Sequence, residues 1–233
     1  MMIFNVSKSY EDMLNKIGIF TWGFLIVSWY LVLLSFPEFN QYINESIKEF
    51  FEIKSSITIF GFELPFSFVI PTAISIICRI IKLHDRVSDL LDIRLNYDCY
   101  NILIPLAEGS GCSIRSLKKI KENRTDLMGK TFYKYAGYTS PAIDQHLINM
   151  ALDSLCWYWI IVEGLVVTLT TFIICIFSSK LGIIRMLFLI IIILIIACLG
   201  LRNTCKKRTS SEVNAILNGA TRKNEIKAVF DAL

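Results

Sequence analysis

Glu163 is an acidic residue inside one of the most apolar stretches of the chain, WYWIIVEGLVVTLTTF. A charged side chain in the core of a bilayer costs about 2–3 kcal/mol even on lenient insertion scales, so it requires a partner or a water-filled cavity. Arg79 ends another apolar stretch and is expected at a similar depth. Two interpretations stay open. An Arg79–Glu163 pair clamps two spans together, or a ring of Glu163 carboxylates lines an oligomeric pore and favours cations.

A second candidate site is the basic stretch RSLKKIKENRTDLMGKTFYKYAGY, in which cationic and aromatic residues are interleaved. Cations contact phosphates and aromatic rings stack on bases, so this composition suits a nucleotide or a single-stranded oligonucleotide. Alternatively, the charges reflect a cytoplasmic location and rest on anionic lipid headgroups. The candidate ligand-binding residues are Arg115, Lys118, Lys119, Lys121, Arg124, Lys130, Tyr133 and Lys134.

No catalytic motif accompanies these residues, because the chain has no H-E-x-x-H, G-x-S-x-G or P-loop sequence. The seven cysteines are odd in number, and no pair has C-x-x-C spacing. Such residues in or beside apolar stretches are expected to be free thiols rather than disulfides or zinc ligands. With only two histidines in addition, we expect no catalytic residue, no metal site and no cofactor.

Long apolar blocks must position these side chains. Hydrophobic residues make up 54% of the 233, against roughly 45–50% in soluble domains, and they gather in unbroken runs near the length that crosses a bilayer. The sequence therefore predicts an all-α membrane protein with four transmembrane helices and a cytoplasmic helical bundle. The expected spans are Ile17–Phe36, Leu64–Ile81, Cys156–Phe177 and Ile183–Leu201. Pro65 and Pro71 are expected to kink the second span.

The distribution of lysine and arginine predicts the orientation. The N-terminal arm, the middle region and the tail together hold 18 basic residues, whereas the loop after the first span has only Lys48 and Lys54. Four spans place those three basic parts on one side, so both termini are expected in the cytoplasm of a multi-pass inner-membrane protein. The acidic loop from Pro37 to about Phe60 then faces outward, where NQYINESIKEFFEIK suits a short interfacial amphipathic helix.

Four segments follow from this topology. The polar region is expected to form three helices: one that continues the second span without a break up to Gly109 and Gly111, one over about Ser113–Tyr135, and one that begins near Pro141 and enters the third span. The tail is expected to form two short helices divided at Gly219. The segments are 1–82 (arm, two spans and outer loop), 83–154 (cytoplasmic helices), 155–201 (transmembrane hairpin) and 202–233 (cytoplasmic tail).

Four spans with a cytoplasmic helical bundle and no catalytic constellation resemble the small membrane effectors of bacterial antiphage defence systems. The resemblance covers the architecture of the whole chain, rests on no motif and transfers no residue roles. It implies a pore that breaks the membrane barrier under the control of a nucleotide or oligonucleotide supplied by a partner enzyme.

We therefore expect a homo-oligomeric channel, a tetramer or larger, because one chain of four spans encloses no water-filled path. The channel would lie in the lipid bilayer and be gated through its basic cytoplasmic region. One alternative is a non-conducting anchor or adaptor that recruits a soluble partner. A second alternative is a lipid-modifying enzyme that works at the cytoplasmic interface.

Overall fold

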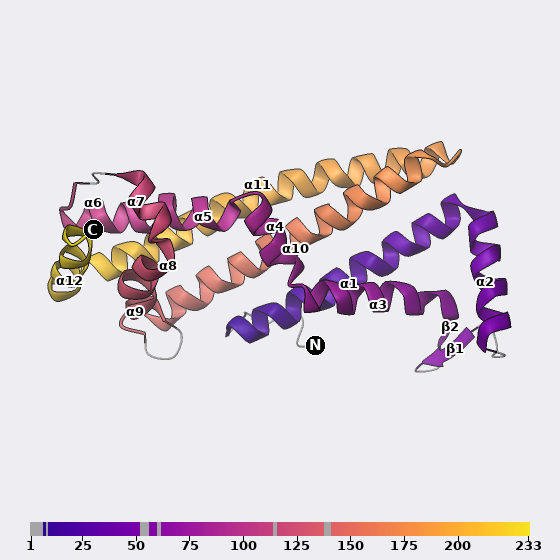
Figure 1. Ribbon diagram of the computed structural model, residues 1–233, viewed down its shortest axis with the longest axis horizontal. Coiled ribbons are helices and arrows are strands. Elements are labelled where there is room, and N and C mark those ends of the chain that lie inside the picture. The colour runs from indigo at the N-terminus through magenta and orange to yellow at the C-terminus, as the bar shows by residue number, and fades with distance from the viewer. Residues whose placement is uncertain (1–6, 8, 52–55, 60–61, 114–115, 138–140) are drawn as a thin grey trace. The chain divides into compact units, whose positions relative to one another are not determined.

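A computed structural model describes the chain except residues 1–6, 8, 52–55, 60–61, 114–115 and 138–140 (Figure 1). The fold divides into two compact units. Unit 1 comprises Met1–Leu14, His84–Tyr158 and Leu199–Leu233, and unit 2 comprises Asn15–Leu83 and Trp159–Cys198. Two long helices, α10 (Gln145–Ile176) and α11 (Leu181–Leu217), each contribute residues to both units.

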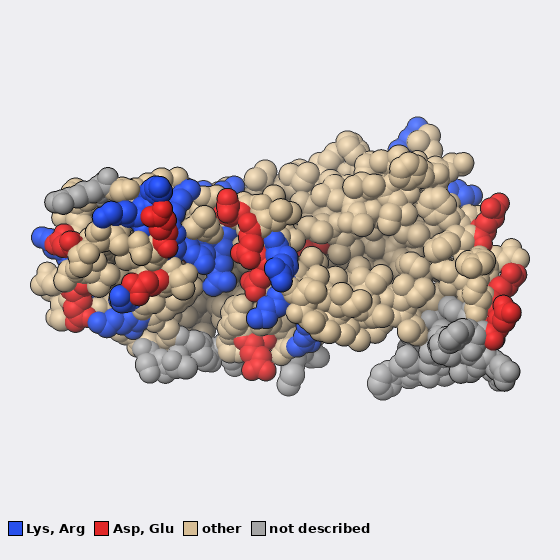
Figure 2. All heavy atoms as spheres, viewed as in Figure 1, with Lys and Arg blue, Asp and Glu red and all other residues tan. Residues whose placement is uncertain are grey.

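Unit 2 contains the apolar helices. Within the described part of the chain, three helices are long and apolar enough to cross a membrane: α1 (Tyr10–Ser35), α10 and α11. They contain the predicted first, third and fourth spans. Figure 2 shows an almost uncharged surface over these helices, and large side chains such as Ile173, Leu189 and Ile193 are exposed on it. Lipid is the solvent that such a surface requires, which indicates a membrane protein.

The predicted second span is not one helix. Strand β2 (Phe62–Pro65) and a 3₁₀ turn, η1 (Phe66–Phe68), precede α3 (Val69–Ile80), which has 12 residues. A helix of that length rises only about 18 Å, against about 30 Å of hydrocarbon. Pro71 lies in the first turn of α3, where a missing amide hydrogen costs nothing, so the expected kink in mid-helix is absent from α3. The four-span topology stays a prediction.

Before α3, the chain forms an amphipathic helix and a hairpin. The expected interfacial helix is present as α2 (Pro37–Phe51). Strand β1 (Ser56–Ile59) then pairs antiparallel with β2, and Ser56 lies opposite Pro65. The sequence analysis did not predict this hairpin, because four-residue strands show too little alternation to be recognised.

The helices of unit 2 pack through small and apolar contacts. Leu31, Val32, Cys175 and Leu187 form a buried cluster between α1, α10 and α11. Helix α3 runs antiparallel to α1, because Thr72 at its start bonds to Trp22 and Arg79 at its end bonds to Asn15. These contacts fix which faces of α1 meet its neighbours.

Unit 1 is a bundle of short helices around one apolar core. Leu103, Leu106, Ile120, Ile216 and Ile226 are among its most buried side chains. The elements besides the ends of α1, α10 and α11 are α4 (Leu83–Leu90), α5 (Ile93–Asp98), the π-helical η2 (Cys99–Leu103), α6 (Ile104–Ser110), α7 (Leu117–Glu122), α8 (Arg124–Leu127), the π-helical η3 (Met128–Phe132), α9 (Tyr133–Ala136) and α12 (Ala220–Asp231).

Two helices of this unit that were predicted to be continuous are interrupted in the structure. The helix expected to continue unbroken from the second span is interrupted at Lys82 and Asp92, whose φ angles are 50° and 49°. The helix expected over Ser113–Tyr135 is divided at Asn123 and changes to π geometry in η3. The first break has left-handed backbone at Lys82 and Asp92. The second combines φ −100° and ψ 15° at Asn123 with the π geometry of η3. None of these residue types requires such a conformation.

Two helix boundaries at glycine were predicted correctly, but the first of the two short tail helices is not a separate element, because α11 runs unbroken from the predicted fourth span to Leu217. Gly111, with φ 87°, follows the last residue of α6, and Gly219 precedes α12. Glycine adopts the left-handed conformation at a helix end without a steric penalty. The continuous helix through the third span is also confirmed, since α10 begins at Gln145.

Candidate functional site

Glu163 lies on α10 with 3% of its surface exposed. The hydroxyl of Thr21, on α1, donates a hydrogen bond to its Oε2 atom. Next to it, a Cβ on Gly164 would lie only 2.6 Å from the ring of Phe24. The absence of a side chain at Gly164 therefore lets α1 and α10 approach closely at the level of the carboxylate.

Arg79 contacts the same face of α1 one to two turns away. Its Nη2 atom donates to Oδ1 of Asn15 at 2.5 Å, and Nη1 lies 3.8 Å from the Cβ position of Gly18. Asn15, Gly18 and Thr21 are spaced by three residues, so they share one face of the helix. Arg79 and Glu163 are thus both held on this face, whereas the direct clamp and the pore ring stay predictions.

Sequence reasoning missed Asn15 and Thr21. The signal that would have found them is a polar or small residue at every third position of an otherwise apolar span, because polar groups in a membrane helix bond across to neighbouring helices. Ser35, further along α1 and outside this three-residue series, makes another polar contact with α10, since its hydroxyl donates to Sγ of Cys175 at 3.3 Å.

The predicted basic ligand-binding residues do not form one open surface. Arg115 lies outside the described residues. Lys118 pairs with Glu122 at 3.8 Å, Lys130 with Asp126 at 2.8 Å and Lys134 with Glu225 at 2.5 Å. Lys119 donates to the carbonyl oxygen of Leu233 at 2.6 Å. Each of these four lysines therefore has an oxygen partner within the chain, at hydrogen-bond distance for Lys119, Lys130 and Lys134 and at 3.8 Å in the exposed Lys118–Glu122 pair.

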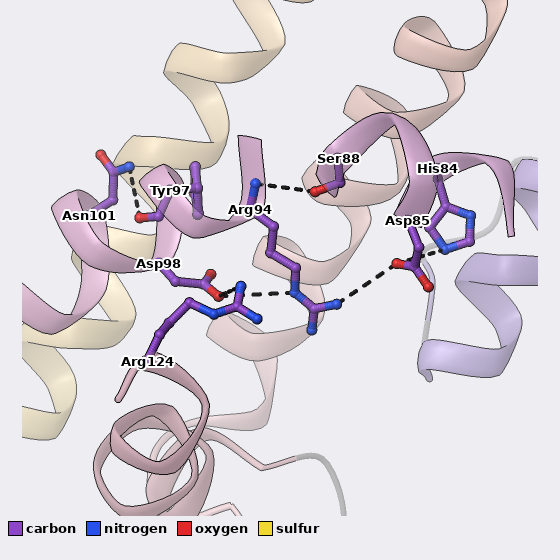
Figure 3. A network of polar contacts seen from close by, with 8 residues as sticks. All are labelled: His84, Asp85, Ser88, Arg94, Tyr97, Asp98, Asn101 and Arg124. Atoms are coloured by element: carbon purple, nitrogen blue, oxygen red, sulfur yellow. Dashed lines mark hydrogen bonds and ion pairs between the residues drawn. The ribbon is translucent and has the colours of Figure 1, made fainter. Parts of the chain in front are cut away.

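Arg124, shown in Figure 3, and Lys121 have a different environment. Arg124 pairs with the Oδ2 atom of Asp98 at 3.1 Å, and Arg94 reaches the same oxygen at 4.0 Å. Lys121 lies 5.8 Å from the ring centroid of Tyr100 and donates to Asn96 at 3.4 Å. We call Arg94, Asp98, Lys121 and Arg124 the Asp98 cluster.

Burial dominates the electrostatics of this cluster. It raises the pKa of Asp98 to about 6, although Arg124 and Arg94 act in the opposite direction. Burial lowers the pKa of Arg94, but its hydrogen bond to Tyr133 and the charges of Tyr133 and Asp98 raise it above the usual value. Tyr133, a predicted ligand residue, therefore supports Arg94, which the sequence analysis did not single out. The i,i+4 spacing of Arg94 and Asp98 in the sequence was the signal that could have identified Arg94.

The cluster continues toward α4. Arg94 Nη1 lies 3.8 Å from Asp85, whose carboxylate is 3.5 Å from Nε2 of His84. The backbone amide of Arg94 donates to the hydroxyl of Ser88 at 3.2 Å. These contacts place the guanidinium of Arg94 between two carboxylates, as Figure 3 shows.

Long apolar helices with an internal carboxylate, followed by a charged helical unit, define the class of helical membrane proteins. Within this class, the chain belongs to the YmfE protein family, whose profile matches residues 9–231. It is 26% identical over 225 residues to the uncharacterized protein YmfE of Escherichia coli (strain K12), and the alignment covers 92% of each chain. No solved structure matches the chain.

Proposed function

We propose that the protein is a homo-oligomeric membrane channel that opens under the control of its charged unit 1. The main support for this proposal is the buried carboxylate of Glu163, which lies within the apolar part of α10. Acidic residues inside a span are rare and often mark an ion pathway. In this proposal the Thr21–Glu163 hydrogen bond belongs to the closed state, and rotation of α10 away from α1 turns the carboxylate toward a pore shared by several copies.

Helix continuity supports control by unit 1. Helix α10 has 32 residues and α11 has 37, so they extend about 48 and 56 Å. Both exceed a hydrocarbon thickness of about 30 Å. A helix transmits an axial or rotational displacement along its length, so a ligand that shifts their ends in unit 1 also shifts Glu163.

The proposed channel is an assembly of several copies. Within one chain the carboxylate is enclosed between α1 and α10, and a single chain has too few long helices to surround water. A ring of copies, a tetramer or larger, supplies the enclosing wall. Rings of carboxylates favour cations, so the channel is proposed to be cation-selective.

The proposed biological setting is the bacterial inner membrane, with both termini in the cytoplasm. The relative in Escherichia coli supports a bacterial membrane. Antiphage defence by membrane disruption, with a nucleotide or oligonucleotide from a partner enzyme as the ligand, is proposed from the similarity of architecture to such effectors.

Conductance in a planar bilayer tests the channel directly. The purified protein is expected to give reproducible unitary currents, and Glu163→Gln is expected to lower its cation preference. Thr21→Val is expected to raise the open probability, because it removes the bond that holds Glu163 against α1. Thr170→Val is the matched control, since the Thr170 hydroxyl is exposed and bonds only to Val166 of its own helix, at 2.9 Å.

Silent bilayers under all conditions would refute the channel. Currents whose ion selectivity is the same in the wild type and in Glu163→Gln would remove Glu163 from the pore while leaving conduction intact.

A second candidate function, a membrane adaptor, is favoured by one observation. Leu90 and Leu91 at the end of α4 are 83% and 61% exposed. Adjacent apolar side chains of this kind are common contact points for a partner protein. A non-conducting protein that loses a stable soluble partner on Leu90→Ser and Leu91→Ser substitution would favour the adaptor.

A further inference from the structure

Two cationic side chains of unit 1, Arg94 and Arg124, approach one buried carboxylate at Oδ2 of Asp98. Lys121 is held nearby, because its ammonium group donates to Asn96, two residues before Asp98, and lies 5.8 Å from the ring centroid of Tyr100, two residues after it. Asp98 therefore balances only part of the positive charge of the Asp98 cluster.

The cations of the cluster remain accessible. The side chain of Arg94 is 46% exposed and that of Arg124 is 24% exposed, whereas that of Asp98 is only 10% exposed. The contacts of Arg94 with Asp85 and Asp98, at 3.8 and 4.0 Å, are longer than a normal charge-assisted hydrogen bond. An anion that arrives from solvent meets the guanidinium groups before it meets the carboxylate.

We propose that Arg94, Lys121 and Arg124 bind a phosphate monoester, such as the terminal phosphate of a mononucleotide, and that Asp98 competes with this phosphate for the two arginines. The proposal rests on the proposed ligand control of unit 1 and names the chemistry of that ligand. Guanidinium groups suit it because they donate two parallel hydrogen bonds to phosphate oxygens.

Aromatic rings stand at the edge of the same cluster. Tyr100 is 50% exposed beside Lys121, and Tyr133 is 46% exposed beside Arg94. Exposed aromatic rings next to a phosphate site offer stacking surfaces for a base. This arrangement favours a nucleotide over inorganic phosphate as the natural ligand.

Two π-helical segments border these groups. Segment η2 begins directly after Asp98 and contains Tyr100, and η3 ends directly before Tyr133. Each π turn contains an additional residue relative to an α-helical turn, so the side chains that follow it are rotated around the helix axis. Such bulges are frequent at functional sites.

Calorimetric titration of the full-length protein in detergent with adenosine monophosphate tests the site, with adenosine as the ligand that lacks the phosphate. Arg94→Gln and Lys121→Gln are each expected to weaken binding about fivefold or more, because each removes a charge-assisted contact. Asp98→Asn is expected to tighten binding at least threefold, because it removes the competing carboxylate. Lys118→Gln is the matched control, since Lys118 is 84% exposed and paired with Glu122.

A second titration tests whether the bound phosphate belongs to a soluble nucleotide or to a lipid headgroup. The same variants are titrated with nanodiscs that contain phosphatidic acid or only phosphatidylcholine. Nucleotide binding that depends on Arg94 and Lys121 supports a soluble ligand, and phosphatidic acid binding with the same dependence supports a lipid headgroup. Binding of neither phosphate, or an effect of Lys118→Gln as large as that of Arg94→Gln, overturns the site. Weaker binding by Asp98→Asn overturns the role of Asp98.

Binding and conduction are separable outcomes. A protein that binds the phosphate through Arg94 and Lys121 but never conducts refutes the channel and leaves this site in place. Circular dichroism and the melting temperature of each variant establish that a loss of binding does not reflect unfolding.

Discussion

At the residue scale, two polar side chains of α1 hold Arg79 and Glu163. Asn15 accepts a hydrogen bond from Arg79, and Thr21 donates one to Glu163. A buried carboxylate without such a donor would lose several kcal/mol of solvation. The polar face of α1 therefore makes Glu163 tolerable in an apolar surrounding, whichever function it serves.

The Thr21–Glu163 contact predicts strong coupling in stability. Thr21→Val should lower the free energy of unfolding by about 1.5–3 kcal/mol, the usual contribution of a hydrogen bond to a charged group. In Glu163→Gln the same Thr21 change should cost clearly less, because the charge is gone. Thermal unfolding of the four proteins in detergent measures this cycle, and additive effects would show that the bond contributes nothing.

A parallel cycle tests the clamp between Arg79 and Glu163. If the two charges form a buried pair, Arg79→Gln and Glu163→Gln each leave a lone charge, at a cost on the order of 3–5 kcal/mol. The double variant should then recover part of the loss. Strong coupling with unchanged ion selectivity would restrict Glu163 to a structural role, whereas a selectivity change without loss of stability would exclude the clamp.

Asp98 predicts how unit 1 responds to pH. Its pKa of about 6 lies above its ordinary value of 3.8, so the folded state binds its proton more tightly than the unfolded state. Stability from this group is therefore complete below pH 4 and is lost as the pH rises through 6. At about 1.4 kcal/mol for each pKa unit, the full effect is roughly 3 kcal/mol, and the part between pH 8 and pH 5 corresponds to about one pKa unit.

The uncharged variant Asp98→Asn isolates the contribution of the Asp98 carboxylate to the pH dependence of stability. Asp98→Asn should be more stable than the wild type at pH 8, and the difference should shrink as the pH falls to 5. Melting temperatures over that range measure it. A wild type and an Asp98→Asn variant with the same pH profile would show that Asp98 does not titrate in this window, or that Arg94 and Arg124 outweigh its burial.

At the scale of elements, one arginine fixes the junction between the last two helices. Arg222 on α12 donates to the carbonyl oxygens of Ala215 at 2.9 Å and Ile216 at 3.0 Å, near the end of α11, and to that of Ala142 at 3.1 Å. The last carbonyls of a helix have no partner within it and carry a partial negative charge. The guanidinium therefore terminates α11 and holds α12 on unit 1.

Replacing this arginine should release α12. Arg222→Gln should lower the stability of unit 1 by about 1–3 kcal/mol, because buried carbonyls lose a charged donor. Limited proteolysis should then cut near Gly219 before the rest of the chain. Lys223→Gln, next to it and exposed, is the matched control. Equal protease resistance of both variants would show that apolar contacts of Ile226 suffice to hold α12.

The elements also show what the sequence could predict. Helices α1, α10 and α11 were predictable, because an unbroken apolar run specifies a spanning helix on its own. Helix α3 was not, because its apolar stretch is divided between a strand, a 3₁₀ turn and a helix by contacts with α1 and α2. The left-handed turns at Lys82 and Asp92 were equally hidden, since neither residue type requires positive φ.

The site was predictable in the same partial way. Glu163 was evident from its burial in an apolar run, and Lys121 and Arg124 from the basic stretch. The pairing of Glu163 with Thr21 and of Arg124 with Asp98 was not, because which helix faces meet depends on packing between segments more than 25 residues apart. Arg94 was accessible to sequence reasoning through its i,i+4 spacing to Asp98. The acidic partners of Lys130 and Lys134 likewise changed an apparent ligand surface into a set of ion pairs.

At the scale of the whole molecule, the number of crossings determines the topology. Three long helices alone would place the termini on opposite sides of the membrane, yet 18 of the lysines and arginines lie in the arm, the middle region and the tail. On the positive-inside rule we expect all three in the cytoplasm, which corresponds to an even number of crossings. The segment from β2 to α3 is then predicted to supply the fourth crossing.

The dimensions of that segment permit a crossing. Strand β2, η1 and α3 follow one another from Phe62 to Ile80. Laid end to end, four strand residues, three 3₁₀ residues and twelve α-helical residues reach about 37 Å, more than the hydrocarbon thickness of about 30 Å. Pairing of β2 with β1 provides hydrogen bonds for part of the β2 backbone. Backbone N–H and C=O groups need such internal partners in the hydrocarbon core, where no water is available.

Reporter fusions test this crossing. Alkaline phosphatase, which is active only outside the cytoplasm, should be active when fused after Tyr42 in α2 and inactive when fused after Asp89 in α4 or after Leu233. Green fluorescent protein at the same positions should give the opposite pattern. The decisive comparison is Tyr42 with Asp89, because only the segment from β2 to α3 can carry the chain back across the membrane between them. Equal labelling at these two sites would make α3 a re-entrant helix, leave three crossings and place Leu233 on the opposite side from the N-terminus.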